Sequence, residues 1–476
     1  MNDKRARWLA LYVLCLGDLM IVLDTNIVNV ALPSIQADLG FSQSALAWVV
    51  NAYMLTFGGF LLLSGRLGDL YGNAKVFFGG VVAFTAASIA CGLAPSSTFL
   101  VVGRAIQGLG GAATSAVALA LIMGLFTDPA ERAKAMGFFG FVMSGGGAIG
   151  VLLGGVLTGL LNWHWIFLVN VPIGIAVVVL ARRVLPADSV SETREKLDVT
   201  GAGLVTSALM LAVYGVVGGN EAGWASAQTL STVAGAVVLL IAFVAWESRV
   251  AHPLVPLRLF RLRNVAISQV VGVLWAGAMF ACFFLTALYM TNVLQYDALE
   301  VGLAYLPSCV VMALCSLRLS DRIVMTYGIR RPLAVGLGLA GASLALLSRA
   351  PVDGHYVADL LPAMVLLGIG AGIAFNPVLL AAMGDVEPHE AGLASGVVNT
   401  SFMMGGALGL ASLVALSSWR TESLGTDVAA LNGGFQLAFG AGAIFALAAA
   451  VIGGVFLRPK PMGAPELAGE PEAALA

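Results

Sequence analysis

The sequence predicts an all-α integral membrane protein, and two observations support this fold class. Of the 476 residues, 59% are hydrophobic and only 11% are charged, and the mean hydropathy is +0.94. Soluble domains carry about 25% charged residues, so a chain of this composition belongs in a bilayer. The second observation is a series of fourteen apolar stretches, each near the roughly 20 residues that cross the hydrocarbon layer. The net charge of −2 gives no electrostatic support for a nucleic-acid partner.

The predicted spans fall into three groups along the chain. The first six lie at residues 8–33, 45–65, 75–95, 98–125, 134–160 and 164–185, and two more lie at 201–219 and 227–247. The last six lie at 265–291, 299–317, 329–348, 357–381, 392–417 and 433–456. The first stretch is too long, and too acidic in its middle, for a cleaved signal peptide, so it predicts a retained helix.

The positions of the basic residues test this topology independently. If the N-terminus is cytoplasmic, all but three of the 24 Lys and Arg residues fall in cytoplasmic segments. The three exceptions are Arg349 and Arg420, on the other side, and Arg104, within a span. This asymmetry follows the positive-inside rule. We therefore expect a multi-pass protein of the cell membrane with both termini in the cytoplasm.

A weak internal repeat divides the chain. The sequence GRLGDLYGNAK follows the second stretch, and LRLSDRIVMTYGIRR ends the tenth; both contain R-L-x-D followed by a glycine and a basic residue. Repeats of this kind suggest two homologous bundles around a central pathway. We expect an N-terminal six-helix bundle at 1–185, a linker with two inserted helices at 186–264, a C-terminal six-helix bundle at 265–457 and a disordered cytoplasmic tail at 458–476.

Motifs occur along most of the chain. LDTNIVNVALPSI lies in the first span, GRLGDLYG at residues 65–72, RAIQGLGGA from Arg104, and WHWIFLVNVPIG at residues 163–174. The fifth span reads GFFGFVMSGGGAIGVLLGGVL. Together these resemble the major facilitator superfamily, in particular its fourteen-helix drug:proton antiporter branch (EmrB/QacA type). The antiporter motif of that branch aligns on five glycines, with Val151 where proline is usual: Gly137, Gly146, Gly150, Gly154 and Gly155.

Two acids in the first span, Asp18 and Asp24, are candidates for proton coupling. A low-dielectric surrounding favours the neutral form of a carboxyl, so either residue is a plausible proton carrier; the alternative is a structural carboxyl bonded to a neighbouring helix. In a helix the two side chains point about 120° apart, at positions roughly 9 Å apart along the axis. Arg104 would hold a nearby carboxylate in its charged form. The resemblance implies a coupling role for Arg104, and a fixed salt bridge is the alternative.

Two further groups of residues are candidates. The resemblance implies that the R-L-x-D loops gate the conformational cycle, through Gly65, Asp69, Gly72 and Asp321. Polar residues within spans are candidates for lining a cavity, although each alone is also consistent with an interhelical contact: Asn29, Asn51, Tyr53, Gln107, Gln269, Asn376 and Asn399. Asn376-Pro377 predicts either a helix break beside the cavity or a tolerated kink. The scattered histidines indicate no metal site.

The resemblance implies a proton-coupled antiporter that exports small amphipathic compounds, such as drugs, antibiotics or secondary metabolites, by alternating access. The proton gradient would supply the energy, with no cofactor. The stretch 392–417 contains no acid, which favours a neutral or monocationic substrate over a divalent cation. A facilitator or proton symporter is the first alternative, and a membrane sensor or scaffold is the second. No nucleophile–base pair, metal constellation or phosphate-binding loop indicates an enzyme or an ATP-driven pump. The sequence leaves open the stoichiometry, the oligomeric state and any adaptor protein.

Overall fold

The computed structural model describes residues 4–126, 128–185, 198–250, 253, 257–383 and 391–458, and every regular element in this part of the chain is a helix. The prediction of an all-α protein is therefore confirmed. The α-helices are α1 (Lys4–Leu39), α2 (Gln43–Tyr71), α3 (Asn73–Gly92), α4 (Ser97–Leu125), α5 (Pro129–Leu160), α6 (Trp165–Leu168), α7 (Asn170–Val184), α8 (Val199–Ala222), α9 (Ala227–Glu247), α10 (Arg263–Asn292), α11 (Ala298–Leu314), α12 (Asp321–Tyr327), α13 (Arg330–Leu347), α14 (Leu361–Met383), α15 (Ala391–Leu424) and α16 (Val428–Phe456). A 3₁₀ helix, η1 (Leu257–Arg261), and two π-helical segments, η2 (Cys315–Ser320) and η3 (Tyr356–Leu360), complete the set.

Each of the fourteen predicted stretches coincides with one helix or with two consecutive helical segments. Twelve helices in the described part are long and apolar enough to cross a membrane. The stretch 134–160 lies in α5, part of which is outside the described residues. The stretch 299–317 lies in α11, a helix of 17 residues, and continues into η2. The multi-pass helical architecture is confirmed, and the count of fourteen spans stays a prediction.

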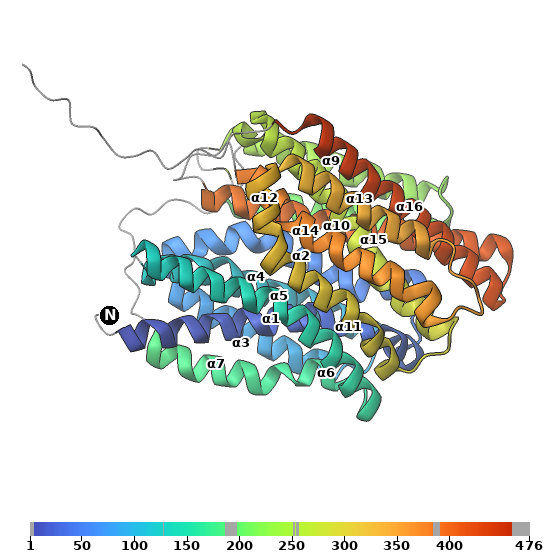
Figure 1. The fold of residues 1–476 in the computed structure, drawn as a ribbon, viewed down its shortest axis with the longest axis horizontal. Helices are drawn as coiled ribbons and strands as arrows, with labels where there is room; N and C mark the ends of the chain where they lie inside the picture. The colour runs from blue at the N-terminus through green and yellow to red at the C-terminus, as the bar shows by residue number, and fades with distance from the viewer. Residues whose placement is uncertain are drawn as a thin grey trace, which may run out of the picture.

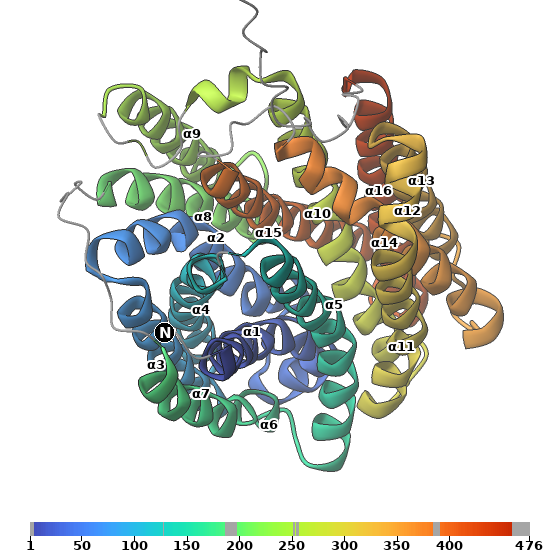
Figure 2. The ribbon, with the colours of Figure 1, turned by 60° about the vertical axis from the view of Figure 1, so that its left-hand side comes forward.

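The helices form two groups with an additional pair at their edge. Figure 2 shows α1–α7 gathered on one side and α10–α16 on the other; α8 packs against α2 and α15, and α9 packs against α8. Figure 1 shows the helices side-on, with the start of α1 at one end of the bundle. We call that end the N-side and the opposite end the far side. Because long helices alternate in direction, α1 and α5 end on the far side, where α11 begins.

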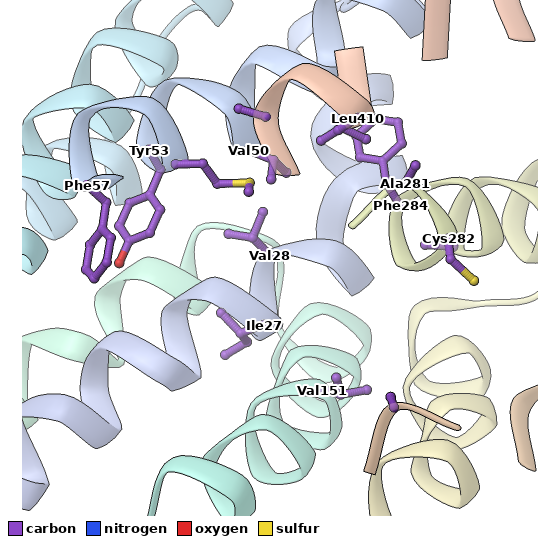
Figure 3. Packing of buried hydrophobic residues seen from close by; sticks show 14 of the residues in the cluster. Ile27, Val28, Val50, Tyr53, Phe57, Val151, Ala281, Cys282, Phe284 and Leu410 are labelled. Atoms are coloured by element: carbon purple, nitrogen blue, oxygen red, sulfur yellow. The ribbon is translucent and has the colours of Figure 1, made fainter. Parts of the chain in front are cut away.

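The contact between the two groups is largely apolar. α2 lies along α15. On the far side, Gln43 Nε2 donates a hydrogen bond to Ser417 Oγ at 3.2 Å, and nearer the N-side Leu62 packs against Gly396. Figure 3 shows apolar side chains of α1, α2, α10 and α15 near this contact, among them Val28, Val50 and Leu410. All three belong to one continuous buried core.

At the far side the two groups meet through backbone. A Cβ on Gly155 of α5 would lie 2.9 Å from the carbonyl oxygen of Ala298 and 3.1 Å from Gly302 Cα of α11. No side chain fits at such distances, so glycine at both positions permits the approach. The far-side seam, defined by Gly155 and Gly302, is therefore closed in this conformation.

The internal repeat has a counterpart in the backbone. Gly72 follows α2 with a φ of 101°, and Gly328 follows α12 with a φ of 72°. Both values lie in the region that favours glycine, so each R-L-x-D segment leads to a glycine-dependent turn into the next long helix. The second copy differs, because the π-helical segment η2 precedes Asp321.

α14 decides between the two predictions for Asn376-Pro377. It runs from Leu361 to Met383 as one α-helix with Pro377 inside it. Proline removes one backbone donor, and transmembrane helices tolerate the loss when neighbouring helices satisfy the freed carbonyl. The Asn376-Pro377 pair therefore does not break the helix, and the interpretation as a tolerated proline is the right one of the two.

Replacing Gly155 by alanine should disturb the far-side seam. The new methyl group would press on two backbone positions that have no room to rotate away, and overpacking of this kind destabilises by about 1–3 kcal/mol. We expect Gly155→Ala to lower the Tm of the purified protein and to slow transport. Gly159→Ala is the matched control, because a Cβ there would meet only Leu299, at 3.4 Å or more. Equal Tm values for the two variants would contradict the tight seam.

Candidate functional site

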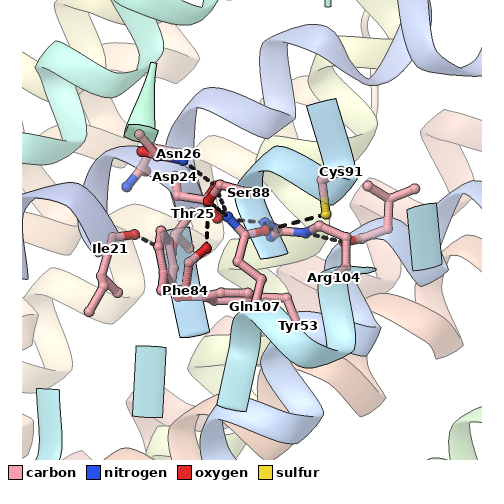
Figure 4. Close-up of polar contacts among 12 residues, drawn as sticks. Ile21, Asp24, Thr25, Asn26, Tyr53, Phe84, Ser88, Cys91, Arg104 and Gln107 are labelled. Atoms are coloured by element: carbon pink, nitrogen blue, oxygen red, sulfur yellow. Dashed lines mark hydrogen bonds and ion pairs between the residues drawn. The ribbon is translucent and has the colours of Figure 1, made fainter. Parts of the chain in front are cut away.

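Asp24 lies in the middle of α1, fully buried, at the centre of a polar network (Figure 4). Its Oδ2 accepts a hydrogen bond from Arg104 Nη1 at 2.5 Å. Its Oδ1 accepts hydrogen bonds from Gln107 Nε2 at 2.6 Å and from Asn170 Nδ2 at 3.0 Å. Three donors from two other helices thus occupy both oxygens of one carboxyl.

Arg104 of α4 is buried as deeply as its partner, with 1% of its surface exposed. Its Nη1 also donates to Gln107 Oε1 at 2.7 Å, and its Nε donates to the Val49 carbonyl oxygen at 3.0 Å. The guanidinium carbon lies 4.3 Å from the ring centroid of Tyr53, within cation–π range. The charge of Arg104 is thus compensated by one carboxylate, by neutral acceptors and by an aromatic face.

The sequence explains part of this network. Arg104 and Gln107 are three residues apart on α4, so they share one face of that helix and reach Asp24 together. Two further members were not singled out from the sequence: Asn170, the first residue of α7, and Ser88 of α3, which accepts a hydrogen bond from Gln107 Nε2 at 2.9 Å. The signal for Asn170 was its place as a polar residue inside the apolar run WHWIFLVNVPIG.

Asp18 is also buried on α1 but lies outside this network. It is 1% exposed, and its Oδ1 accepts a hydrogen bond from Ser115 Oγ of α4 at 2.5 Å. Its Oδ2 has no hydrogen-bond partner in the described part of the chain. The two acids therefore lie in different environments, one with a cation and one without.

The glycines of α5 form a smooth face against α1. A Cβ on Gly150 or Gly154 would lie 2.9 Å or less from a backbone carbonyl oxygen of α1, and one on Gly146 would touch Leu19 and Val22. Gly155 faces α11 instead, and the surroundings of Gly137 lie outside the described residues. Val151, in the place of the usual proline, is buried beside Gly302.

The remaining candidates lie in different environments. Tyr53 and Gln107 belong to the Arg104 network, and Asn29 is buried with its Nδ2 3.4 Å from the Thr25 carbonyl oxygen. Asn376 is half-buried and Asn399 is exposed.

Asn51 of α2 and Gln269 of α10 are buried, one in each half. Neither side-chain amide has a hydrogen-bond partner among the described residues. Buried amides in this state are rare in native proteins. They therefore mark places where a water molecule or a polar ligand would be stabilised.

In the two gating segments the structure describes the glycines but not the side chains of the two aspartates. Gly65 lies in α2 with open space where a Cβ would stand, and Gly72 makes the turn into α3. The side chains of Asp69 and Asp321 lie outside the described residues, so the latch stays a prediction. Within the described part, no group of three or more His, Cys, Asp or Glu residues is arranged to hold a metal ion.

These features define a class. Two groups of helices that meet along a seam, with a buried charged network in the helices of one group, are the architecture of a secondary membrane transporter. Residues 14–410 match the Major Facilitator Superfamily, and the chain belongs to this family. It is therefore a transporter and not an enzyme.

The chain is similar over most of its length to resistance and export proteins of other bacteria. It is 38% identical to a puromycin resistance protein of Streptomyces alboniger, over 88% of this chain and 84% of that one. It is also 38% identical to a cephamycin export protein of Amycolatopsis lactamdurans, over 93% and 91%. A lincomycin resistance protein of Streptomyces lincolnensis is 33% identical over 87% and 85%.

A solved structure supports the fold alone. An auto-inhibited peptide transporter of the POT family superposes with a TM-score of 0.68, covering 97% of this chain and 98% of the other at 16% identity.

A double-mutant cycle should detect the buried ion pair. Removing one partner leaves a buried charge without compensation, which destabilises by about 3–5 kcal/mol. We expect Asp24→Asn and Arg104→Gln each to lower the Tm strongly. The Tm of the double variant should fall by much less than the sum of the two single decreases. Glu422→Gln, an exposed acid at the end of α15, is the control and should have little effect. Additive losses would show that the two residues do not interact energetically.

Proposed function

We propose that the chain is a proton-coupled antiporter that exports small amphipathic compounds from the cell. The observation that carries the proposal is the buried Asp24–Arg104 network, in a member of a superfamily whose relatives with 33% to 38% identity are named as resistance and export proteins. Ionisable residues buried within spans are costly and mark proton or ion pathways.

Alternating access supplies the transport cycle. The positive-inside rule puts the N-side in the cytoplasm, so the far-side seam at Gly155 and Gly302 would face the exterior. With that seam closed, the substrate enters from the cytoplasm. Rocking of the two halves then closes the N-side and opens the seam. The buried amides of Asn51 and Gln269, one in each half, would contact the substrate.

The proposed substrate class follows from where the buried charged residues lie in the two halves. Buried charged residues of the described part occur in α1 and α4 and at the ends of α8 and α9, and the buried polar residues of α10–α16 are all neutral. A cavity with one neutral wall favours a neutral or monocationic compound. Puromycin, lincomycin and a cephamycin are suitable first probes, because relatives are named for them.

Transport in proteoliposomes with an imposed pH gradient tests the proposal. We expect addition of a probe that is a substrate to change the lumenal pH in liposomes with the native protein and not in empty liposomes. Asp24→Asn should abolish this proton flow, because the network loses the charge that holds Arg104.

Three outcomes would contradict parts of this picture. Substrate movement without proton movement in the native protein would indicate a facilitator. Proton and substrate movement in the same direction would indicate a symporter. A divalent cation transported faster than all the other probes would overturn the expected substrate class alone.

A further inference from the structure

Asp18 presents a carboxyl oxygen that nothing in the described structure engages. Its Oδ1 accepts a hydrogen bond from Ser115, while its Oδ2 is buried without a partner in the described part of the chain. The residue is 99% buried, so bulk water does not solvate this oxygen in the present conformation. A proton can bind at Oδ2 without displacing any donor.

Asp24 is the opposite case. Arg104, Gln107 and Asn170 occupy both of its oxygens with three donors. Adding a proton would displace a donor and leave the Arg104 guanidinium buried without a counter-charge, which is strongly unfavourable. Asp24 is therefore suited to remain ionised throughout the cycle.

The groups around Asp18 give it no counter-charge. The titratable groups that act on or near it are the Cys15 thiol, one turn earlier on α1, and the Tyr53 phenol of α2, both ordinarily neutral near pH 7. On α4, Arg104 is paired with Asp24. The described charged residues of the other helices that pack on α1 lie near helix ends: Glu131 and Lys134 on α5, Arg182 and Arg183 on α7, Arg263 on α10, Glu300 on α11 and Arg66 on α2.

We propose that Asp18 is the group that takes up and releases the transported proton, while Asp24 stays ionised beside Arg104. This inference rests on the proposed antiport. An O–H bond forms at Asp18 Oδ2 when a proton arrives from the far side. The same bond breaks when the proton passes to water on the N-side, and the substrate moves in the opposite direction.

The two carboxyls connect the same helices at two levels. Ser115 lies eight residues after Gln107, about 12 Å along α4, so Asp18 and Asp24 link α1 to α4 one below the other. A hydrogen bond to an ionised carboxylate is roughly twice as strong as one to a neutral group. Protonation therefore weakens the Asp18–Ser115 link and leaves the Asp24–Arg104 link intact, so α1 can pivot about the latter.

The full-length protein in liposomes, with puromycin as the probe, tests this assignment in two assays. The first measures accumulation driven by two pH units, which supplies up to about 100-fold accumulation for each proton. The second measures puromycin exchange at equal pH, which needs no net proton transfer. We expect Asp18→Asn to lose the driven accumulation while its exchange rate stays close to the native rate. Glu422→Gln, an exposed acid at the end of α15, is the control and should behave like the native protein.

The outcomes separate this inference from the proposed function. If the native protein exchanges puromycin but shows no response to the pH gradient, the antiport fails and this assignment falls with it. If the native protein couples and Asp18→Asn couples equally well, antiport stands and the assignment to Asp18 is overturned. Loss of both driven accumulation and exchange in Asp18→Asn would show that Asp18 has a structural role, and would also overturn the assignment.

Infrared difference spectroscopy provides a second test that does not require the Asp18 variant to fold. The C=O stretching frequency of a protonated carboxyl depends on its hydrogen bonds. The carboxyl band that changes on puromycin binding should therefore shift when a hydrogen-bond partner of that carboxyl is removed. We expect Ser115→Ala to shift this band and Ser88→Ala, which alters the hydrogen bond to Gln107 beside Asp24, to leave it in place. The reverse pattern would assign the proton to Asp24.

Discussion

The buried ion pair between Asp24 and Arg104 is the interaction on which the N-terminal half depends. Both charges are removed from water, and their attraction compensates this only because further hydrogen bonds satisfy the remaining atoms. Those bonds come from different helices: Val49 of α2, Gln107 of α4 and Asn170 of α7. One salt bridge thus fixes the relative positions of four helices, α1, α2, α4 and α7, and through the Ser88 bond it reaches α3.

The two halves are held together internally by different means. The C-terminal half has no buried charged residue in its described part. Its polar contacts are neutral, such as Tyr289 donating to the Pro351 carbonyl oxygen at 2.6 Å and Ser343 donating to that of Ala363 at 2.6 Å. In the proposed antiport, changes in protonation would therefore act mainly on the N-terminal half. They would reach the C-terminal half through the contacts of α2 with α15 and of α5 with α11.

Hydropathy was sufficient to predict the helices, because a span in lipid must satisfy its own backbone and can do so only as a helix. The pairing of Asp24 with Arg104 was also within reach, since a buried base needs an acid. Asn170, Ser88 and Ser115 were not, because their roles depend on which helices become neighbours. The same holds for Gly302, whose contact with Gly155 joins residues 147 positions apart. The continuous course of α14 through Pro377 depended on its neighbours as well.

The separation of the ion pair along the chain has a consequence for biosynthesis. Asp24 and Arg104 are 80 residues apart, so at about 5–20 residues per second α1 is made roughly 4–16 s before its partner in α4. During this interval an acid lies in the membrane with no cation beside it, at a cost of about 2.5–3.5 kcal/mol on insertion scales. The newly made α1 is therefore a candidate for retention at the translocon, or for assistance by an insertase, until α4 arrives.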